Sequence, residues 1–340
     1  MTNQARVSFL VLAVTLILVG FLKLGAPLLA ILFSYFVLTQ LSRFIPNKWF
    51  TLTVFVLLVG AISYTTIHFT RAAIVALPKI ADNSIPSALS WAEAHNLQLP
   101  FTDFESLKAQ TIAAVKEQAH YLGNVANFAR HASTTLVFIL IAVVCAVSIF
   151  FNSQLDLFRE THKVRNNLYS ALCDEITARF TEFYRSFATV MGAQMTISAI
   201  NTVFTAVFVF AVQLPHAPVV VGLTFLCGLF PIVGNIVSNT VIVFVGFLVS
   251  PKVAIGALVF LVVIHKLEYF LNSKIIGDRI RNPIWMTLIG LILGERLMGV
   301  PGMILSPVVL NYLRVEMSKI EVAKQAQAGH PAVDPNERSS

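Results

Sequence analysis

Charged and polar side chains interrupt an apolar stretch of the sequence near residue 265. The uncharged run Val253–Ile264 is followed directly by His265, Lys266 and, two positions later, Glu268. A membrane-spanning helix needs about 20 residues to cross roughly 30 Å of hydrocarbon, so this span must continue through the charged positions. A charged side chain in hydrocarbon costs at least ~2.5 kcal/mol and is usually functional or paired. We therefore predict that this segment carries the chemistry of the protein.

The spacing of these residues places three of them on one face of a helix. His265 and Glu268 are three positions apart, and Asn272 lies one turn beyond Glu268. An imidazole, a carboxylate and an amide in one stripe suit a proton or cation pathway, or polar contacts to a hydroxylated solute. Two other interpretations stay open: an internal ion pair for Glu268, and a neutral, packed His265. Lys266 lies on another face, from which it can reach the headgroups.

A second polar stripe precedes this one in the chain. Gln194, Ser198 and Asn201 repeat at helical spacing within an otherwise apolar span. They could complete a polar core around Glu268. Ordinary hydrogen bonds between neighbouring helices explain them equally well.

The composition indicates a membrane protein. Hydrophobic residues make up 56% of the 340 residues and charged residues only 12%, where soluble chains carry roughly 25% charge. Several uncharged apolar stretches predict an all-α polytopic fold, because a helix satisfies its own backbone within lipid. The net charge of +7 fits basic cytoplasmic loops, so we expect no nucleic-acid partner. Three scattered cysteines, and the absence of hydrolase and phosphate-loop motifs, predict no enzyme, no cofactor and no metal.

The apolar stretches and the basic residues together predict a topology. Lys and Arg concentrate in the loops on one side of the expected spans, so both termini are expected in the cytoplasm. The six predicted full spans are Val7–Leu22, Ala26–Thr39, Thr51–Phe69, Thr134–Phe151, Val190–Val212 and Val253–Asn272. The first of these is expected to be an anchor and not a cleaved signal, since a second span follows it at once.

The spans divide the chain into segments. Residues 1–70 hold the N-terminal spans, 71–131 an extracytoplasmic helical insertion, 132–152 a span and 153–187 a cytoplasmic amphipathic helix. Residues 188–320 form the transport core, and 321–340 a disordered tail. Thr102–Glu105 reads as a capping box that starts a helix of the insertion. Its apolar face could pack on the membrane domain or on another subunit. The amphipathic helix has no Gly or Pro before the next span and is predicted to continue into it.

Residues 219–249 are expected to form a hairpin. Two apolar arms of about 12 and 10 residues flank a polar centre at 230–239, and both are too short to cross a bilayer. We expect a re-entrant hairpin that enters from the outside. A pair of tilted full spans joined at Gly234 is the alternative. The residues expected at the tip are Pro231, Gly234, Asn235 and Asn239.

Residues 283–314 behave similarly from the cytoplasmic side. Short apolar arms flank a centre that contains Glu295 and Arg296, followed by the tip residues Gly299, Pro301 and Gly302. Interrupted segments that enter from opposite sides are typical of the midplane site of a transporter. The alternative is that the glycines and prolines serve only close helix packing.

The C-terminal half contains a series of short motifs within residues 220–310. In order they are Phe-Pro-Ile-Val-Gly (230–234), Ser250-Pro251, Leu267-Glu268, Asn272, Lys274-Ile-Ile-Gly277, Asn282-Pro283, Gly294 and Gly299-Val-Pro-Gly302 with Pro307. This series resembles the autoinducer-2 exporter family of bacterial permeases, and the resemblance covers nearly the whole chain. It implies a homo-oligomeric permease of the bacterial inner membrane. Some relatives are linked to export of a quorum-sensing furanone and others to sodium/proton exchange. This chain has Asn235 where the family often has Pro, and His265 where it often has Gln.

Together these features predict six full spans plus two re-entrant helical hairpins. The leading hypothesis is a secondary permease in the lipid bilayer that exports a small polar organic solute. Glu268 and His265 would couple transport to protons or to cations such as Na+. A monovalent cation/proton antiporter is the first alternative. A non-transporting membrane scaffold is the second, and it requires that the polar residues pair only with one another.

Overall fold

The computed structural model describes residues 3–94, 125–157, 159–162, 164, 167–230, 233–271 and 283–319. Within these ranges the chain is all-helical and contains no strand, which confirms the predicted fold class. The helices are α1 (Asn3–Phe21), α2 (Gly25–Phe44), α3 (Lys48–Ala94), α5 (Val125–Phe151), α6 (Leu168–Ala211), α7 (Ala217–Gly228), α8 (Val233–Val249), α9 (Pro251–Leu271), α10 (Ile284–Met298) and α11 (Val300–Ser318), with a short 3-10 helix at Arg159–Thr161.

Four of these helices are long and apolar enough to cross a bilayer. They contain the segments Gly25–Phe44, Lys48–Ala72, Thr134–Phe151 and Leu168–Ala211. Shorter apolar helices occupy Val7–Phe21, Ala217–Gly228 and Gly234–Val249. The chain is therefore a multi-pass membrane protein. The count of six full spans and the re-entrant character of the hairpins stay predictions.

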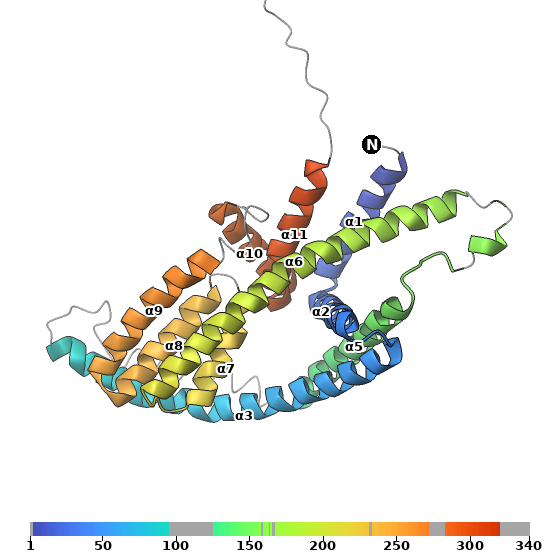
Figure 1. Ribbon diagram of the computed structural model, residues 1–340. Helices are drawn as coiled ribbons and strands as arrows, with labels where there is room; N and C mark the ends of the chain where they lie inside the picture. Colours follow the sequence, from blue (N-terminus) through green and yellow to red (C-terminus); the bar gives the residue numbers. More distant parts are fainter. Residues whose placement is uncertain are drawn as a thin grey trace, which may run out of the picture.

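The long helix α6 connects the two halves of the molecule. Its 44 residues extend about 66 Å at 1.5 Å per residue. Asn167 caps its first turn by accepting a hydrogen bond from the backbone N–H of Ser170 at 2.8 Å. The amphipathic segment continues into the next span without a break, as the lack of Gly and Pro between them predicts. Figure 1 shows α6 passing diagonally from α1 and α11 to the group α7–α9.

Two separate hydrophobic cores lie along α6. The first joins α1, α2, the N-terminal half of α6 and α11, and Phe187 and Met191 of α6 are fully buried in it. The second joins α3, the C-terminal half of α6 and α7, α8 and α9, around Val209, Val220 and Val245. Because α3 and α6 both run from one group of helices to the other, they are the continuous elements that hold the two cores together (Figure 1).

The first hairpin has a shorter turn than the sequence suggested. Helix α7 ends at Gly228 and α8 already begins at Val233, so the second arm has 17 residues instead of about 10. Gly234, Asn235 and Asn239 therefore lie in the first two turns of α8 and not in an open loop.

The second hairpin turns at a single residue. Helices α10 and α11 are separated only by Gly299, whose φ of 66° lies in the region that favours glycine. Glu295 and Arg296 therefore belong to the last turn of α10. The two arms touch closely, because a Cβ on Gly294 would overlap the backbone carbonyl of Gly302, and the reverse also holds.

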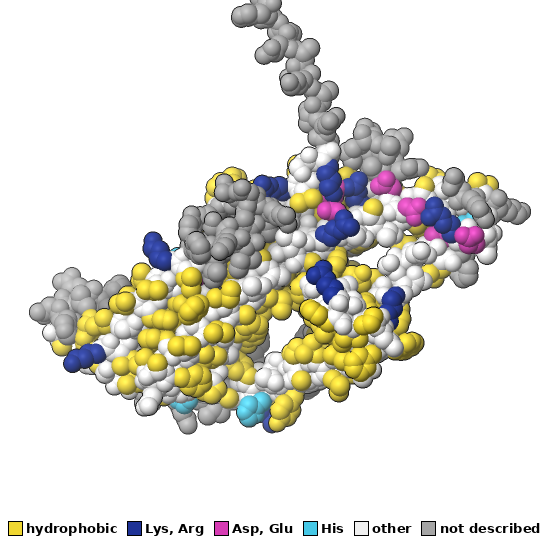
Figure 2. Space-filling view, viewed as in Figure 1, with side chains coloured by type: hydrophobic (Ala, Val, Ile, Leu, Met, Phe, Trp, Pro, Cys, Tyr) yellow, Lys and Arg dark blue, Asp and Glu magenta, His cyan; other side chains and the backbone are white. Residues whose placement is uncertain are grey.

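The predicted insertion begins as a continuation of the third span. Helix α3 extends to Ala94, and the ring of Trp91 lies 6.1 Å from that of Phe247 on α8. The capping box at Thr102–Glu105 and the tail 321–340 lie outside the described residues. Figure 2 shows hydrophobic side chains over the surface of the α7–α9 group, whereas acidic side chains gather at the N-terminal end of α6 and near α11.

Candidate functional site

A small polar recess lies where α6, α7, α8 and α9 meet. Among the described residues that line it, Glu268 is the one acidic residue and none is Lys or Arg. The free space in it is about 10 Å³, which is room for about one water-sized species. The described residues that line it are Asn201, Thr205, Thr224, Gly228, Asn235, Ser238, Asn239, Leu261, Ile264, His265 and Glu268.

Glu268 is held by the first hairpin. The side-chain Nδ2 of Asn235 donates to Glu268 Oε1 at 2.8 Å and to Oε2 at 2.6 Å. The amide must turn its NH2 group to the carboxylate, since Oδ1 offers no hydrogen for these oxygens. Hydrogen bonds to an ionised group are among the stronger ones in proteins. The predicted tip residue and the predicted coupling residue therefore form one unit across α8 and α9.

The polar stripe of α6 binds the C-terminal end of α7. Gln194 Nε2 donates to the carbonyl oxygen of Gly228 at 2.6 Å, and Ser198 Oγ donates to that of Phe225 at 2.8 Å. These carbonyls belong to the last turn of α7, where a helix leaves its carbonyl groups without internal partners. These two hydrogen bonds join α6 to α7, as the helix-packing interpretation of the stripe expects.

Asn201, the third residue of this stripe, differs from the other two. It is only 7% exposed, yet within the described part of the chain its Oδ1 has no hydrogen-bond partner. A buried polar atom without a partner costs about 1–3 kcal/mol, so such atoms are rare in native proteins. Asn201 lines the recess, and its free acceptor therefore marks a place where a bound species can contribute to stability.

Glycines allow the hairpin to approach α6 and α7 at this point. A Cβ on Gly234 would overlap the carbonyl oxygen of Cys227, and a Cβ on Gly228 would overlap the side chain of Ser198. A larger residue at Gly234 would push the start of α8 away from α7, and one at Gly228 would push α7 away from Ser198 on α6. These two glycines therefore allow the close packing of α7 with α6 and α8 on which the position of Asn235 depends.

The remaining residues of the first stripe and the first hairpin are less central. His265 is exposed and lies at the rim of the recess, and Asn239 is half-buried in its wall. Asn272 and Pro231 lie outside the described residues. Sequence reasoning missed Thr205, Thr224 and Ser238, three buried hydroxyl residues that also line the recess. Thr205 could have been found, because it continues the stripe of Gln194, Ser198 and Asn201 by one more turn.

The structure does not bring the second hairpin into the recess. The side chains of Glu295 and Arg296 are 55% and 85% exposed and lie 3.8 Å from each other. The tip of this hairpin packs instead against the start of α2, where a Cβ on Gly25 would lie 3.0 Å from the Cβ atoms of Met298 and Pro301. Gly299 and Gly302 therefore belong to the turn and the packing of α10 and α11.

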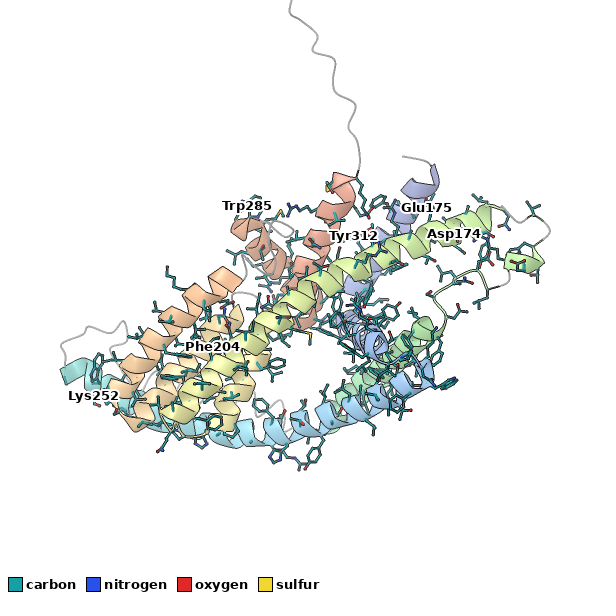
Figure 3. The ribbon with its side chains drawn as sticks, in the orientation of Figure 1. Asp174, Glu175, Phe204, Lys252, Trp285 and Tyr312 are labelled. Atoms are coloured by element: carbon teal, nitrogen blue, oxygen red, sulfur yellow. The ribbon has the colours of Figure 1, made fainter. Side chains whose placement is uncertain are left out.

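A second charged cluster joins α1, α6 and α11. The guanidinium of Arg179 pairs with the buried carboxylate of Glu316, donates to Ser8 Oγ at 3.3 Å and lies 4.0 Å above the ring of Phe9. Lys319 Nζ lies 3.0 Å from Glu316. Figure 3 shows Glu175 on α6 and Tyr312 on α11 on the side of the molecule where these helices meet. This cluster holds the second hairpin to α6.

Comparison with known proteins agrees with this architecture. The family model described as AI-2E family transporter matches residues 7–320 of the chain. A curated protein of Bacillus subtilis (strain 168) named "Putative transport protein YdbI" is 25% identical over 199 residues, which cover 57% of this chain and 53% of that protein. The matched part thus spans about half the length of the relative. Because the family model covers nearly the entire chain, the chain belongs to the AI-2E transporter family, in keeping with its multi-pass architecture.

Proposed function

We propose that the protein is a secondary permease that exports a small polar organic solute and couples export to protons or cations at Glu268. The bond from Asn235 to both carboxylate oxygens of Glu268 is the observation that carries this proposal. It places an ionisable group at a helix break, among polar residues of four helices. Ionisable residues in such surroundings mark substrate and ion pathways in membrane proteins.

The pair of Asn235 and Glu268 also offers a way to link binding to motion. A proton, a cation or a solute hydroxyl that reaches the carboxylate competes with the Asn235 amide for the same oxygens. Loss of the amide bond loosens α8 from α9 and lets the hairpin move. A ligand can shift a conformational equilibrium only by such a difference in its contacts between two states.

The proposal has several finer features, some from the family and some from the sequence. The solute is autoinducer-2-like, as the family name suggests. Further parts of the proposal are the bacterial inner membrane, cytoplasmic termini, re-entrant hairpins, a homo-oligomer and auxiliary roles for His265 and Asn272. We do not include Glu295 and Arg296 in the coupling site, because both are exposed and distant from the recess lining.

A monovalent cation/proton antiporter is the second candidate. The narrow recess favours it, because about 10 Å³ of free space admits an ion or a water but not an organic solute in this conformation. The scaffold alternative is weaker, since it requires that buried polar groups pair among themselves, and Oδ1 of Asn201 has no partner among the described residues.

Transport by purified protein in proteoliposomes separates these candidates. Vesicles are loaded with an autoinducer-2-like furanone or with radioactive sodium, and release is followed under an imposed pH gradient. We expect furanone release by the wild type and by Glu295→Gln, and a loss of most of it in Glu268→Gln. Release of sodium without furanone would favour the antiporter. Release of neither would contradict both transport proposals.

A further inference from the structure

We infer that the recess is a binding site for one monovalent cation, held by the carboxylate of Glu268 and the Oδ1 of Asn201. This inference rests on the proposed function and names the chemical class of the coupled ion. Asn201 contributes the first observation: an acceptor that is more than nine-tenths buried, lines the recess and has no partner among the described residues.

Two further groups around the recess can supply oxygen ligands or negative charge to a cation. Thr224 Oγ1 donates its hydrogen to the carbonyl of Val220 at 2.9 Å, which leaves its lone pairs free to accept. The C-terminal end of α7 also reaches the recess at Gly228, and this end of a helix carries a partial negative charge. Carboxylate, amide and hydroxyl oxygens near a half-helix C-terminus are the surroundings in which transporters bind sodium.

The charge of the recess selects the valence of the ion. Glu268 is the one carboxylate among the described lining residues, and no Lys or Arg accompanies it. A single positive charge would neutralise it, whereas a divalent ion would leave an unpaired charge in a buried place, which is costly. The free space for about one water-sized species also fits a single dehydrated ion.

Asn235 takes the place of the cation when none is bound. Its Nδ2 donates to the same two carboxylate oxygens that a cation would use. A cation that binds Glu268 must displace this group, and Asn235 can then turn its own carbonyl oxygen toward the ion. Binding is therefore tied to the contact between α8 and α9.

Thermal unfolding of the purified full-length protein in detergent tests this inference. Melting temperatures are compared in sodium chloride and in choline chloride at equal ionic strength. We expect sodium to raise the melting temperature of the wild type in a saturable way, by about 2–4 °C at ten times its dissociation constant. The rise should be absent in Glu268→Gln and Asn201→Leu and intact in Glu295→Gln, which makes the same chemical change away from the recess.

The variant Asn201→Asp tests whether the lost sodium effect in Asn201→Leu comes only from misfolding. It adds a second carboxylate to the recess, so we expect calcium to stabilise this variant but not the wild type. A merely structural role for Asn201 would not create that response. A wild type without a sodium effect, or a sodium effect retained in Asn201→Leu, would overturn the inference. If furanone export driven by a pH gradient persists in that case, the proposed function stands without the cation site.

Discussion

Asn235 donates its side-chain amide to both carboxylate oxygens of Glu268, at 2.8 and 2.6 Å. The two residues are 33 positions apart and belong to α8 and α9. Their contact joins the first hairpin, formed by α7 and α8, to α9, the apolar helix that contains charged residues near its end. It is a direct physical link between two unusual features of the sequence.

Removal of this amide should impair transport. We expect Asn235→Ala to lower the rate of solute release at least about tenfold, because a hydrogen bond to a charged group contributes about 1.5–3 kcal/mol. Solute release from proteoliposomes measures the effect. Asn239→Ala is the matched control, since Asn239 lies on the same helix and lines the same recess. Equal losses in the two variants would contradict a special role for the Asn235 bond.

Close backbone contact at the hairpin should make Gly234 intolerant of any side chain. We expect Gly234→Ala to lower the free energy of unfolding by about 1–3 kcal/mol or more, because its Cβ overlaps the carbonyl of Cys227. Gly256→Ala on α9 is the control, since a Cβ there meets nothing within 4 Å. That change should be neutral or stabilising, as Ala favours helices over Gly. Thermal unfolding in detergent compares them, and similar melting temperatures would refute the packing argument.

The pair of Arg179 and Glu316 should contribute to stability far more than exposed pairs do. Glu316 is buried, so we expect Glu316→Ala to cost about 3 kcal/mol, because Arg179 then keeps only its longer contact of 3.9 Å to Glu175 and its bond to Ser8. The pair of Arg159 and Asp174 on the surface provides the control, because Asp174→Ala should cost at most about 1 kcal/mol. A double change to apolar residues, Arg179→Met with Glu316→Leu, should recover part of the loss. Unfolding in detergent measures the stability of each variant. Equally small losses of stability in Glu316→Ala and Asp174→Ala would contradict the importance of the buried pair.

The sequence predicted the residues of the recess better than their contacts. Glu268 and Asn201 stood out because each is a polar residue at helical spacing in an apolar stretch. Asn235 stood out because it lies in a polar interruption. What joins Asn235 to Glu268 is the close packing of α8 on α9, where a Cβ on Gly246 would lie 2.9 Å from the Cα of Ala254. No periodicity in the sequence reveals that contact.

Long-range charge pairing was beyond sequence reasoning. Arg179 and Glu316 are 137 positions apart, and each lies in a segment with other charged residues that offer equally plausible partners. The two hairpins also appeared equivalent in sequence. The structure separates them, because Gly294 and Gly302 close the second hairpin on itself while its tip packs on Gly25.

The depth of the two hairpins can be measured with single cysteines. Asn235→Cys and Gly299→Cys are made after Cys145, Cys173 and Cys227 have been replaced, and each is labelled from either side of sealed vesicles. Re-entrant hairpins predict slow labelling of both positions, since their tips lie within the bilayer. Fast labelling of either cysteine by a membrane-impermeant reagent from one side would indicate a full-span arrangement for that hairpin.

The role of Glu268 in coupling is tested most directly by comparing two modes of transport in one variant. Solute exchange across vesicles without a gradient requires only binding and motion, whereas accumulation against a concentration difference requires coupling to an ion. We predict that Glu268→Gln keeps measurable exchange but loses accumulation driven by a pH or sodium gradient, while Glu295→Gln keeps both. Gradient-driven accumulation by Glu268→Gln at the wild-type level would contradict the assignment of Glu268 as the coupling residue.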